Sequence, residues 1–251
     1  MKSIQLGGQD TLVLVTTRKF DKVITIGDPI SQAKIFEAQA ADELIFLDLD
    51  ARTNNRNPVI DIIRGASEEI FMPITVGGGI NNLEDFRLLL SNGADRISIN
   101  TSAVDDPNLI YNASQSYGNS TVVVSIDYRY DDNGSAKVYT KGGNKKTNLN
   151  PLDWAMECEK LGAGEILLTC IDLDGTCEGL DNKMTNEVVS RLSIPVITSG
   201  GCGLASHFTE GFIDGNAAAV SAGTYFSLKD QNPMQTRSHI KNIGIPIRFQ
   251  K

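Results

Sequence analysis

The chain has 251 residues, 41% hydrophobic and 22% charged, so it can bury a large core without a disulfide or a metal. Its formal net charge of −8 repels a phosphate backbone, which argues against nucleic-acid binding and requires local dipoles to hold any anionic substrate. The sequence contains no apolar run of membrane-helix length and no signal-peptide pattern, so we expect a cytoplasmic protein with no membrane partner.

Cysteine and histidine usage restricts the chemistry further. The four cysteines form no CxxC pair and fit no zinc spacing, which indicates reduced thiols. The two histidines, His207 and His239, fall in different predicted elements, which argues against a histidine triad or a multi-histidine metal site. We therefore expect neither a metal nor another cofactor.

Short apolar runs rich in β-branched residues alternate along the chain with stretches of helical spacing. In chain order, the clearest predicted strands are 44–49, 74–76, 96–99, 122–126, 166–171, 196–198 and 217–221. The predicted helices are 29–40, 82–92, 152–161 and 183–192. Asp28-Pro29 and Asn82 are typical helix starts, and residues 128–146 resemble a loop with a turn at 131–134. This alternation predicts parallel strands with helical crossovers, in one domain spanning residues 1–251.

The sequence also repeats itself at half length. Pro73-Ile74-Thr75 matches Pro195-Val196-Ile197, and Gly78-Gly79 matches Gly200-Gly201, both at the same offset of 122 residues (from 73 to 195 and from 78 to 200). Two halves of about four β/α units each predict an α/β fold: a single (β/α)₈ TIM barrel with an internal half-barrel repeat.

Glycine-rich loops follow the third and seventh predicted strands. Backbone N–H groups can approach an anion closely at Gly78-Gly79 and at Gly200-Gly201, although a single such loop would equally be a tight turn. Asn100-Thr101 and Ala222-Gly223 follow the neighbouring strands and would complete the two sites. Because the loops are symmetric, we expect two phosphate sites at the carboxyl ends of the strands.

Aspartates end several of the predicted strands. Asp127 ends the fifth strand, where a carboxylate suits general acid–base catalysis or, alternatively, caps the loop. Four other aspartates end strands two and six: Asp48, Asp50, Asp172 and Asp174. We expect one or two of them to bind substrate hydroxyls and the rest to organise loops.

Charged residues also begin four strands, at the opposite end of the barrel. These residues are Lys2, Glu43, Arg96 and Glu165. They could form a salt-bridged ring across the barrel or simple surface pairs, and their chemistry alone favours surface pairs, which stabilise by only about 0–1 kcal/mol.

Together these segments resemble the HisF family, the cyclase subunit of imidazole glycerol phosphate synthase, over residues 27–226. The most specific matches are Thr75-Val76-Gly77-Gly78-Gly79-Ile80, Gly93-Ala94-Asp95-Arg96-Ile97-Ser98-Ile99-Asn100-Thr101 and Asp172-Leu173-Asp174-Gly175-Thr176. The resemblance implies that Asp127 is catalytic and that ammonia arrives from a glutaminase partner at the barrel floor. It implies two phosphate sites, formed by Gly78, Gly79, Asn100 and Thr101 and by Asp174, Gly175, Gly200, Gly201, Ala222 and Gly223. It also implies a charged ammonia gate of Lys2, Glu43, Arg96 and Glu165, with Thr75 and Ser98 lining the channel.

The first strand departs from the family pattern. Family members carry a catalytic aspartate there, and counting back from Gly27 places Gly8 at that position and Thr16 where a lysine is expected. Asp10 shares strand parity with Gly8 but lies about 6.8 Å further along a regular strand. Loss of such an acid lowers the rate about 10²–10⁴-fold unless Asp10 replaces it.

Three functions are consistent with this pattern. We favour an ammonia-channelling HisF-like subunit that amidates a sugar or nucleotide-sugar for surface-polysaccharide biosynthesis, like the glycosyl amidation-associated (WbuZ-type) branch. The second is an authentic histidine-pathway cyclase, which converts a phosphorylated amino-carboxamide ribulotide and ammonia into imidazole glycerol phosphate and an aminoimidazole carboxamide ribotide. The third is a non-catalytic scaffold that activates a glutaminase, for which the anion loops would be unnecessary.

Overall fold

In the described part of the chain, eight parallel strands form the centre of the protein. The computed structural model describes residues 1–5, 12–49 and 60–248. In spatial order the parallel strands are β1 (Lys2–Gln5), β4 (Leu44–Asp48), β5 (Ile74–Gly77), β6 (Arg96–Ile99), β7 (Val122–Tyr130), β10 (Glu165–Cys170), β11 (Val196–Ser199) and β12 (Ala219–Ser221). This curled sheet alternates with helices and confirms the predicted α/β class and (β/α)₈ fold.

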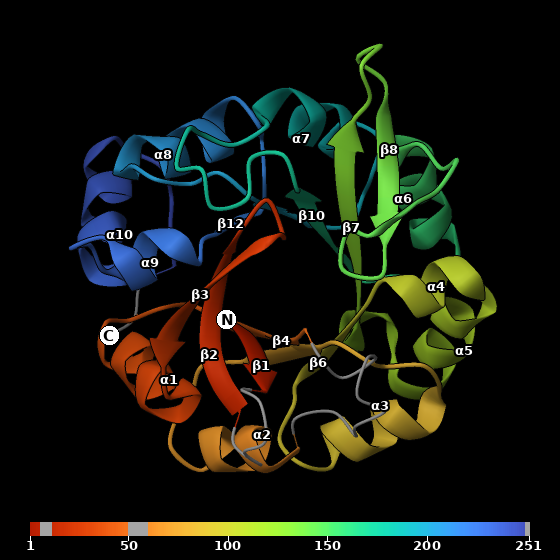
Figure 1. The fold of residues 1–251 in the computed structure, drawn as a ribbon, viewed down its shortest axis with the longest axis horizontal. Helices are drawn as coiled ribbons and strands as arrows, with labels where there is room; N and C mark the ends of the chain where they lie inside the picture. The colour runs from red at the N-terminus through yellow and green to blue at the C-terminus, as the bar shows by residue number, and fades with distance from the viewer. Residues whose placement is uncertain (6–11, 50–59, 249–251) are drawn as a thin grey trace.

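Helices surround the strands as an outer ring (Figure 1). They are α1 (Pro29–Ala38), α2 (Ile60–Ser67), α3 (Leu83–Leu90), α4 (Thr101–Asp105), α5 (Asn108–Tyr117), α6 (Pro151–Lys160), α7 (Asn182–Val189), α8 (Ala205–Ile213), α9 (Thr224–Leu228) and α10 (Pro233–Asn242), with a 3₁₀ turn η1 (Asn119–Thr121). Asp28 caps α1 through the Ser31 N–H, and Asn82 forms a capping box with Asp85, which confirms both predicted starts. Among the described residues, no helix is long and apolar enough to cross a membrane.

The parallel strands are covered by apolar side chains on both faces. Val122 and Val124 of β7 pack outward in the large cluster that includes Phe86 and Trp154 of the helices. Val123, between them, packs inward in a smaller cluster inside the barrel. This two-sided burial is why the strands read as continuous apolar runs rather than as alternating ones.

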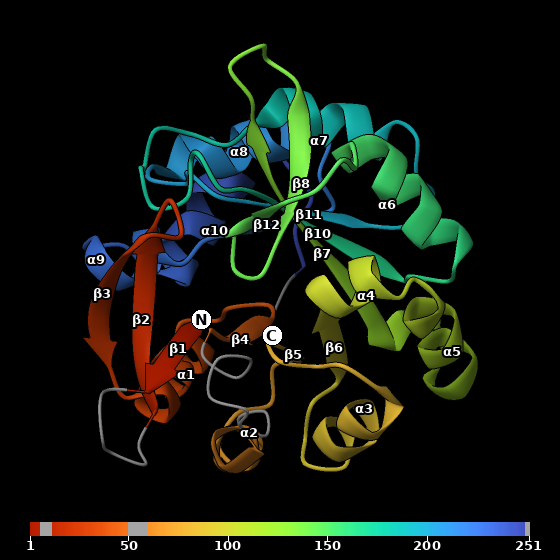
Figure 2. The ribbon, with the colours of Figure 1, turned by 45° about the vertical axis from the view of Figure 1, so that its right-hand side comes forward.

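Two antiparallel hairpins extend the sheet. β2 (Leu12–Arg18) pairs with β1 and with β3 (Lys22–Gly27), while β8 (Ala136–Thr140) pairs with β7 and with β9 (Lys145–Lys146). The expectation of a loop at 128–146 is therefore wrong, because alternate residues of β8 are buried against the barrel. The turn at 131–134 is confirmed by a bond of 2.8 Å from the Gly134 N–H to the Asp131 carbonyl. Figure 2 shows the β7–β8 hairpin projecting beyond the ring of helices.

Candidate functional site

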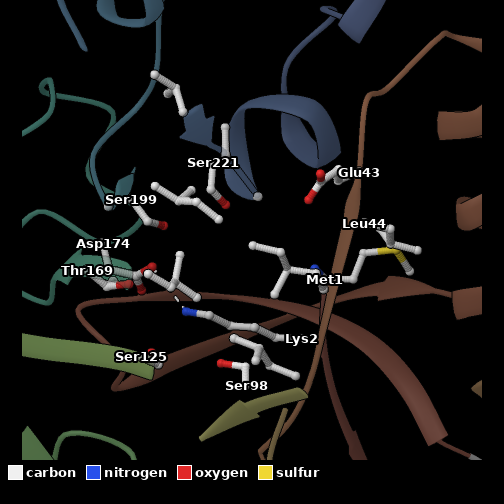
Figure 3. A pocket seen from close by; sticks show the side chains of 18 of the residues that line it. Met1, Lys2, Glu43, Leu44, Ser98, Ser125, Thr169, Asp174, Ser199 and Ser221 are labelled. Atoms are coloured by element: carbon white, nitrogen blue, oxygen red, sulfur yellow. Dashed lines mark hydrogen bonds and ion pairs between the residues drawn. The ribbon is translucent and has the colours of Figure 1, made fainter. Parts of the chain in front are cut away.

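A cavity of about 1430 Å³ takes in space inside the barrel and extends to the outer helices α1 and α10, where Phe36, Thr236 and Ile240 line it. We call the amino ends of the parallel strands the floor and their carboxyl ends the mouth. Glu43 and Glu165 line the cavity at the floor, and Asp127 lines it at the mouth together with both glycine loops. Hydroxyl side chains from successive strands line the space between them; Figure 3 labels Ser98, Ser125, Thr169, Ser199 and Ser221. One continuous space therefore connects the two ends of the barrel.

The first glycine loop follows β5 and lies against β4. Gly78 has φ +102°, and a Cβ atom there would lie 2.1 Å from the Asp48 carbonyl oxygen, so only glycine fits. Thr101 begins α4 beside this loop, and its hydroxyl accepts a bond of 3.0 Å from the Lys141 N–H. The first predicted anion loop thus lies at the mouth, and Lys141 of the β8–β9 turn lines the same cavity.

The second glycine loop repeats this arrangement in the other half of the barrel. A Cβ atom at Gly200 would lie 2.5 Å from the Cys170 carbonyl oxygen, and Cys170 stands at the repeat offset from Asp48. Gly201 packs still closer, because its Cβ atom would lie 1.9 Å from the Gly179 carbonyl oxygen. Ala222 and Gly223 line the same cavity just before α9. The half-barrel repeat therefore extends to the backbone packing of both loops.

Asp127 lies between the two loops at the mouth. Its carboxylate accepts a bond of 2.7 Å from the Asn100 side-chain amide and one of 3.3 Å from the Ser125 hydroxyl. Although the side chain keeps some access to the cavity, the surrounding protein removes most of its water, and this burial raises the pKa of Asp127 to about 6. Lys2 and the two hydrogen bonds oppose that rise, while Asp174 adds to it. A carboxyl group that titrates near neutral pH suits proton transfer.

We predict that the carboxyl group of Asp127 titrates with a midpoint near pH 6, because burial disfavours its charged form. Carbon-13 NMR of aspartate-labelled protein would measure this, with Asp127→Asn assigning the signal. Exposed aspartates, which titrate near pH 4, serve as internal controls. A midpoint near 4 for Asp127 would contradict the burial.

The neighbouring aspartates organise loops. The Asp174 carboxylate accepts hydrogen bonds from the Thr17 hydroxyl at 2.6 Å and from the Phe20 N–H at 3.4 Å. Asp172 accepts from the Tyr130 N–H at 3.0 Å. Gly175 lies so close to β2 that a Cβ atom would stand 2.1 Å from the Thr17 carbonyl oxygen. These contacts fasten the loop after β10 to the two hairpins.

Three of the four predicted gate residues meet at the floor. Arg96 forms ion pairs of 2.8 Å with Glu43 and 3.2 Å with Glu165, whose pKa is raised by burial. The Ser98 hydroxyl above them is buried and lines the cavity, and it has no hydrogen-bond partner in the described part of the chain. Thr75 is also buried but is not part of the cavity lining, so its predicted channel position is not supported.

Lys2 does not belong to the floor cluster, which corrects the sequence-based expectation. The backbone of β1 pairs Lys2 with Leu47, close to the mouth, and its ammonium group reaches Asp174 at 3.1 Å. Figure 3 shows the side chain extending toward Asp174 and away from Glu43. Asp10 and Asp50 lie outside the described residues.

Three residues that complete the mouth were not predicted from the sequence: Thr17 and Phe20 of the β2–β3 hairpin and Lys141 of the β8–β9 turn. The β-branched run Val13-Leu14-Val15-Thr16-Thr17 is a strand signal that could have located the first hairpin. The observed fold and site define a (β/α)₈ barrel built from two related halves, with a candidate ligand site at the mouth.

Comparison with known proteins places the chain within this class. The family model described as histidine biosynthesis protein matches residues 4–230. A Prochlorococcus marinus (strain MIT 9313) protein, provisionally named imidazole glycerol phosphate synthase subunit hisF2, is 48% identical over 239 residues, covering 95% of this chain and 91% of the relative. The imidazole glycerol phosphate synthase subunit HisF of Clostridium botulinum (strain Okra / Type B1) is 43% identical over 225 residues, 89% of each chain. The chain therefore belongs to the histidine biosynthesis protein family, among the HisF proteins.

Proposed function

We propose that this chain is a cyclase-type synthase subunit that uses ammonia supplied by a glutaminase partner. The observation that carries the proposal is the single cavity that connects the floor cluster to Asp127 and both glycine loops. The substrate would be the phosphorylated amino-carboxamide ribulotide, and the products imidazole glycerol phosphate and the aminoimidazole carboxamide ribotide. The HisF names of the relatives support this reaction.

In such a reaction, different residues at the mouth would bind the phosphate groups and transfer protons. Backbone N–H groups of Gly78-Gly79 and Gly200-Gly201 would each hold one phosphate group of the substrate. Asp127 would exchange protons with the reacting ring, and the Asn100 amide would hold its carboxylate in place. Asp10 is the proposed second acid, replacing the aspartate that the family carries at the position of Gly8.

The floor would receive ammonia from the partner. Arg96, Glu43 and Glu165 would form the gate, and the Ser98 hydroxyl would contact ammonia as it passes toward the mouth. Lys2 would not take part in this gate, because its ammonium group lies at the mouth.

We predict that Arg96→Met lowers glutamine-supported turnover more than ammonium-supported turnover, by on the order of tenfold, or about 1.4 kcal/mol. Without its cation the floor keeps Glu43 and Glu165 close together and unpaired, which disrupts the gate but not the mouth. The measurement is a steady-state rate with each nitrogen source in the presence of the partner. The matched control is Arg87→Met, which removes an exposed Arg–Glu pair on α3. Equal losses with both sources would refute the gate.

Amidation of a sugar or nucleotide-sugar for surface-polysaccharide biosynthesis is a second candidate, favoured by Gly8 at the position of the family's strand-one aspartate. Growth of a histidine auxotroph that lacks its own cyclase separates the two candidates. Growth on this chain would exclude the amidation role as its main function. Failure to grow, with ammonium-dependent amination of a sugar phosphate, would favour it. If the chain only stimulates the glutaminase, it is a scaffold.

A further inference from the structure

Lys2 occupies an unexpected place in the barrel. Its strand, β1, is in register with the carboxyl half of β4, where Lys2 pairs with Leu47 and Ser3 pairs with Asp48. A side chain that starts at this height and faces inward reaches the mouth rather than the floor. Figure 3 shows the amine beside Thr169 and Asp174.

Three groups hold the Lys2 amine. It donates to the Thr17 hydroxyl and to the Asp174 carboxylate at 3.1 Å, and it lies 4.2 Å from the centre of the Phe20 ring. The side chains of Lys2 and Asp174 are only 17% and 14% exposed, so this ion pair is poorly screened by solvent. An ion pair enclosed to this degree and supported by two further contacts fixes the position of the amine.

The charges around the mouth explain what this amine does. Among the residues that the structure describes, the charged groups that line this end of the cavity are Lys2, Asp48, Asp127, Lys141 and Asp174. Asp127 and Asp174 repel each other, and Lys2 acts on Asp127 in the opposite sense and lowers its pKa. The Lys2 ammonium is thus placed to offset the repulsion that the Asp174 carboxylate exerts on the Asp127 carboxylate.

We propose that Lys2 is the active-site cation of this chain, a positioning residue that acts through Asp127 and Asp174 rather than as a member of the floor gate. The inference rests on the proposed function for its kinetic test, but its spectroscopic test is independent of any substrate. Without the cation, Asp127 would stay protonated up to a higher pH, and a smaller fraction of it would be available as a base near neutrality.

The first test is the carbon-13 titration of Asp127 in the wild type and in Lys2→Met. We expect the midpoint to rise by about one pH unit in Lys2→Met and to stay close to the wild-type value in Lys2→Arg. Lys22→Met is the matched control, since it removes an exposed lysine of β3 outside the cavity and should leave the midpoint unchanged. An unchanged midpoint in folded Lys2→Met would overturn the proposal. If that variant does not fold, Lys2→Gln, which keeps a hydrogen-bond donor without the charge, replaces it.

The second test uses ammonium-supported turnover at constant free ammonia. We expect the acid limb of kcat/KM to move to higher pH in Lys2→Met, with about a fivefold loss at the wild-type midpoint and about a tenfold loss well below it. A loss seen only with glutamine would place Lys2 in the floor gate and overturn the proposal. If the wild type does not turn over the ribulotide, the proposed function fails, while the titration still decides the role of Lys2.

Discussion

Replacing Asp127 with asparagine is expected to lower ammonium-supported turnover about 10²–10⁴-fold. Asparagine has the same shape and can keep a bond to the Asn100 amide, but it cannot accept a proton. The assay is the loss of ribulotide absorbance at high pH with ample ammonium, which bypasses the glutaminase. Turnover within a few-fold of the wild type would show that Asp127 is not the proton-transfer group.

Stability measurements provide the control for this variant. Burial raises the pKa of Asp127 in the folded state to about 6, above the ordinary aspartate value of 3.8. The folded state therefore binds the proton more tightly, so Asp127 costs stability progressively as pH rises from about 4 to about 6, and the cost persists above that. Asp127→Asn removes a buried charge, so its thermal midpoint at pH 8 should equal or exceed that of the wild type. A lost activity with a retained midpoint then reports on chemistry rather than folding.

Replacing Gly201 with alanine is expected to lower the free energy of unfolding by about 3–5 kcal/mol, combining backbone strain with steric overlap. Gly201 has φ +102°, and a Cβ atom there would lie 1.9 Å from the Gly179 carbonyl oxygen. Its own carbonyl accepts a bond of 2.9 Å from the Gly179 N–H, so the two backbones cannot separate without losing that bond. Urea denaturation measures the effect.

Gly118→Ala is the control that separates the steric overlap at Gly201 from backbone strain in the loss of stability. Gly118 has φ +86°, a similar backbone strain, but a Cβ atom there would meet no atom of the described residues within 4 Å. Its alanine variant should therefore lose only about 1–2 kcal/mol. Equal losses in the two variants would mean that the close approach of the second glycine loop to Gly179 does not constrain the fold.

The barrel could be predicted from the sequence because its signals are local or repeated. The fully buried strands read as apolar runs, as at Val122-Val123-Val124, and capping residues such as Asp28 mark helix starts. The β2–β3 hairpin has a weaker signal, since its turn places Lys19 and Phe20 at φ +56° and +60° without a glycine or asparagine. In the folded protein Phe20 packs against the Lys2 amine at this turn. A contact between residues this far apart in the chain cannot be predicted from a local sequence pattern.

The candidate site was predictable where a residue follows its own strand, as Asp127 and the two glycine loops do. Lys2 was misplaced because its height in the barrel depends on the register between β1 and β4, which lie about forty residues apart. A shift in that register moves a long side chain from the floor to the mouth without changing the sequence pattern. Lys141 was missed for a similar reason, because only the folded hairpin brings it to Thr101.

The most direct test of the cyclase proposal is ammonium-supported turnover of the ribulotide by the purified chain, compared with its Asp127→Asn variant. We predict turnover by the wild type at constant free ammonia, with an acid limb near pH 6 that disappears in Asp127→Asn. Absence of turnover in a folded chain that still binds the ribulotide through its two phosphate groups would contradict the cyclase proposal. The mouth would then serve another ammonia-dependent reaction.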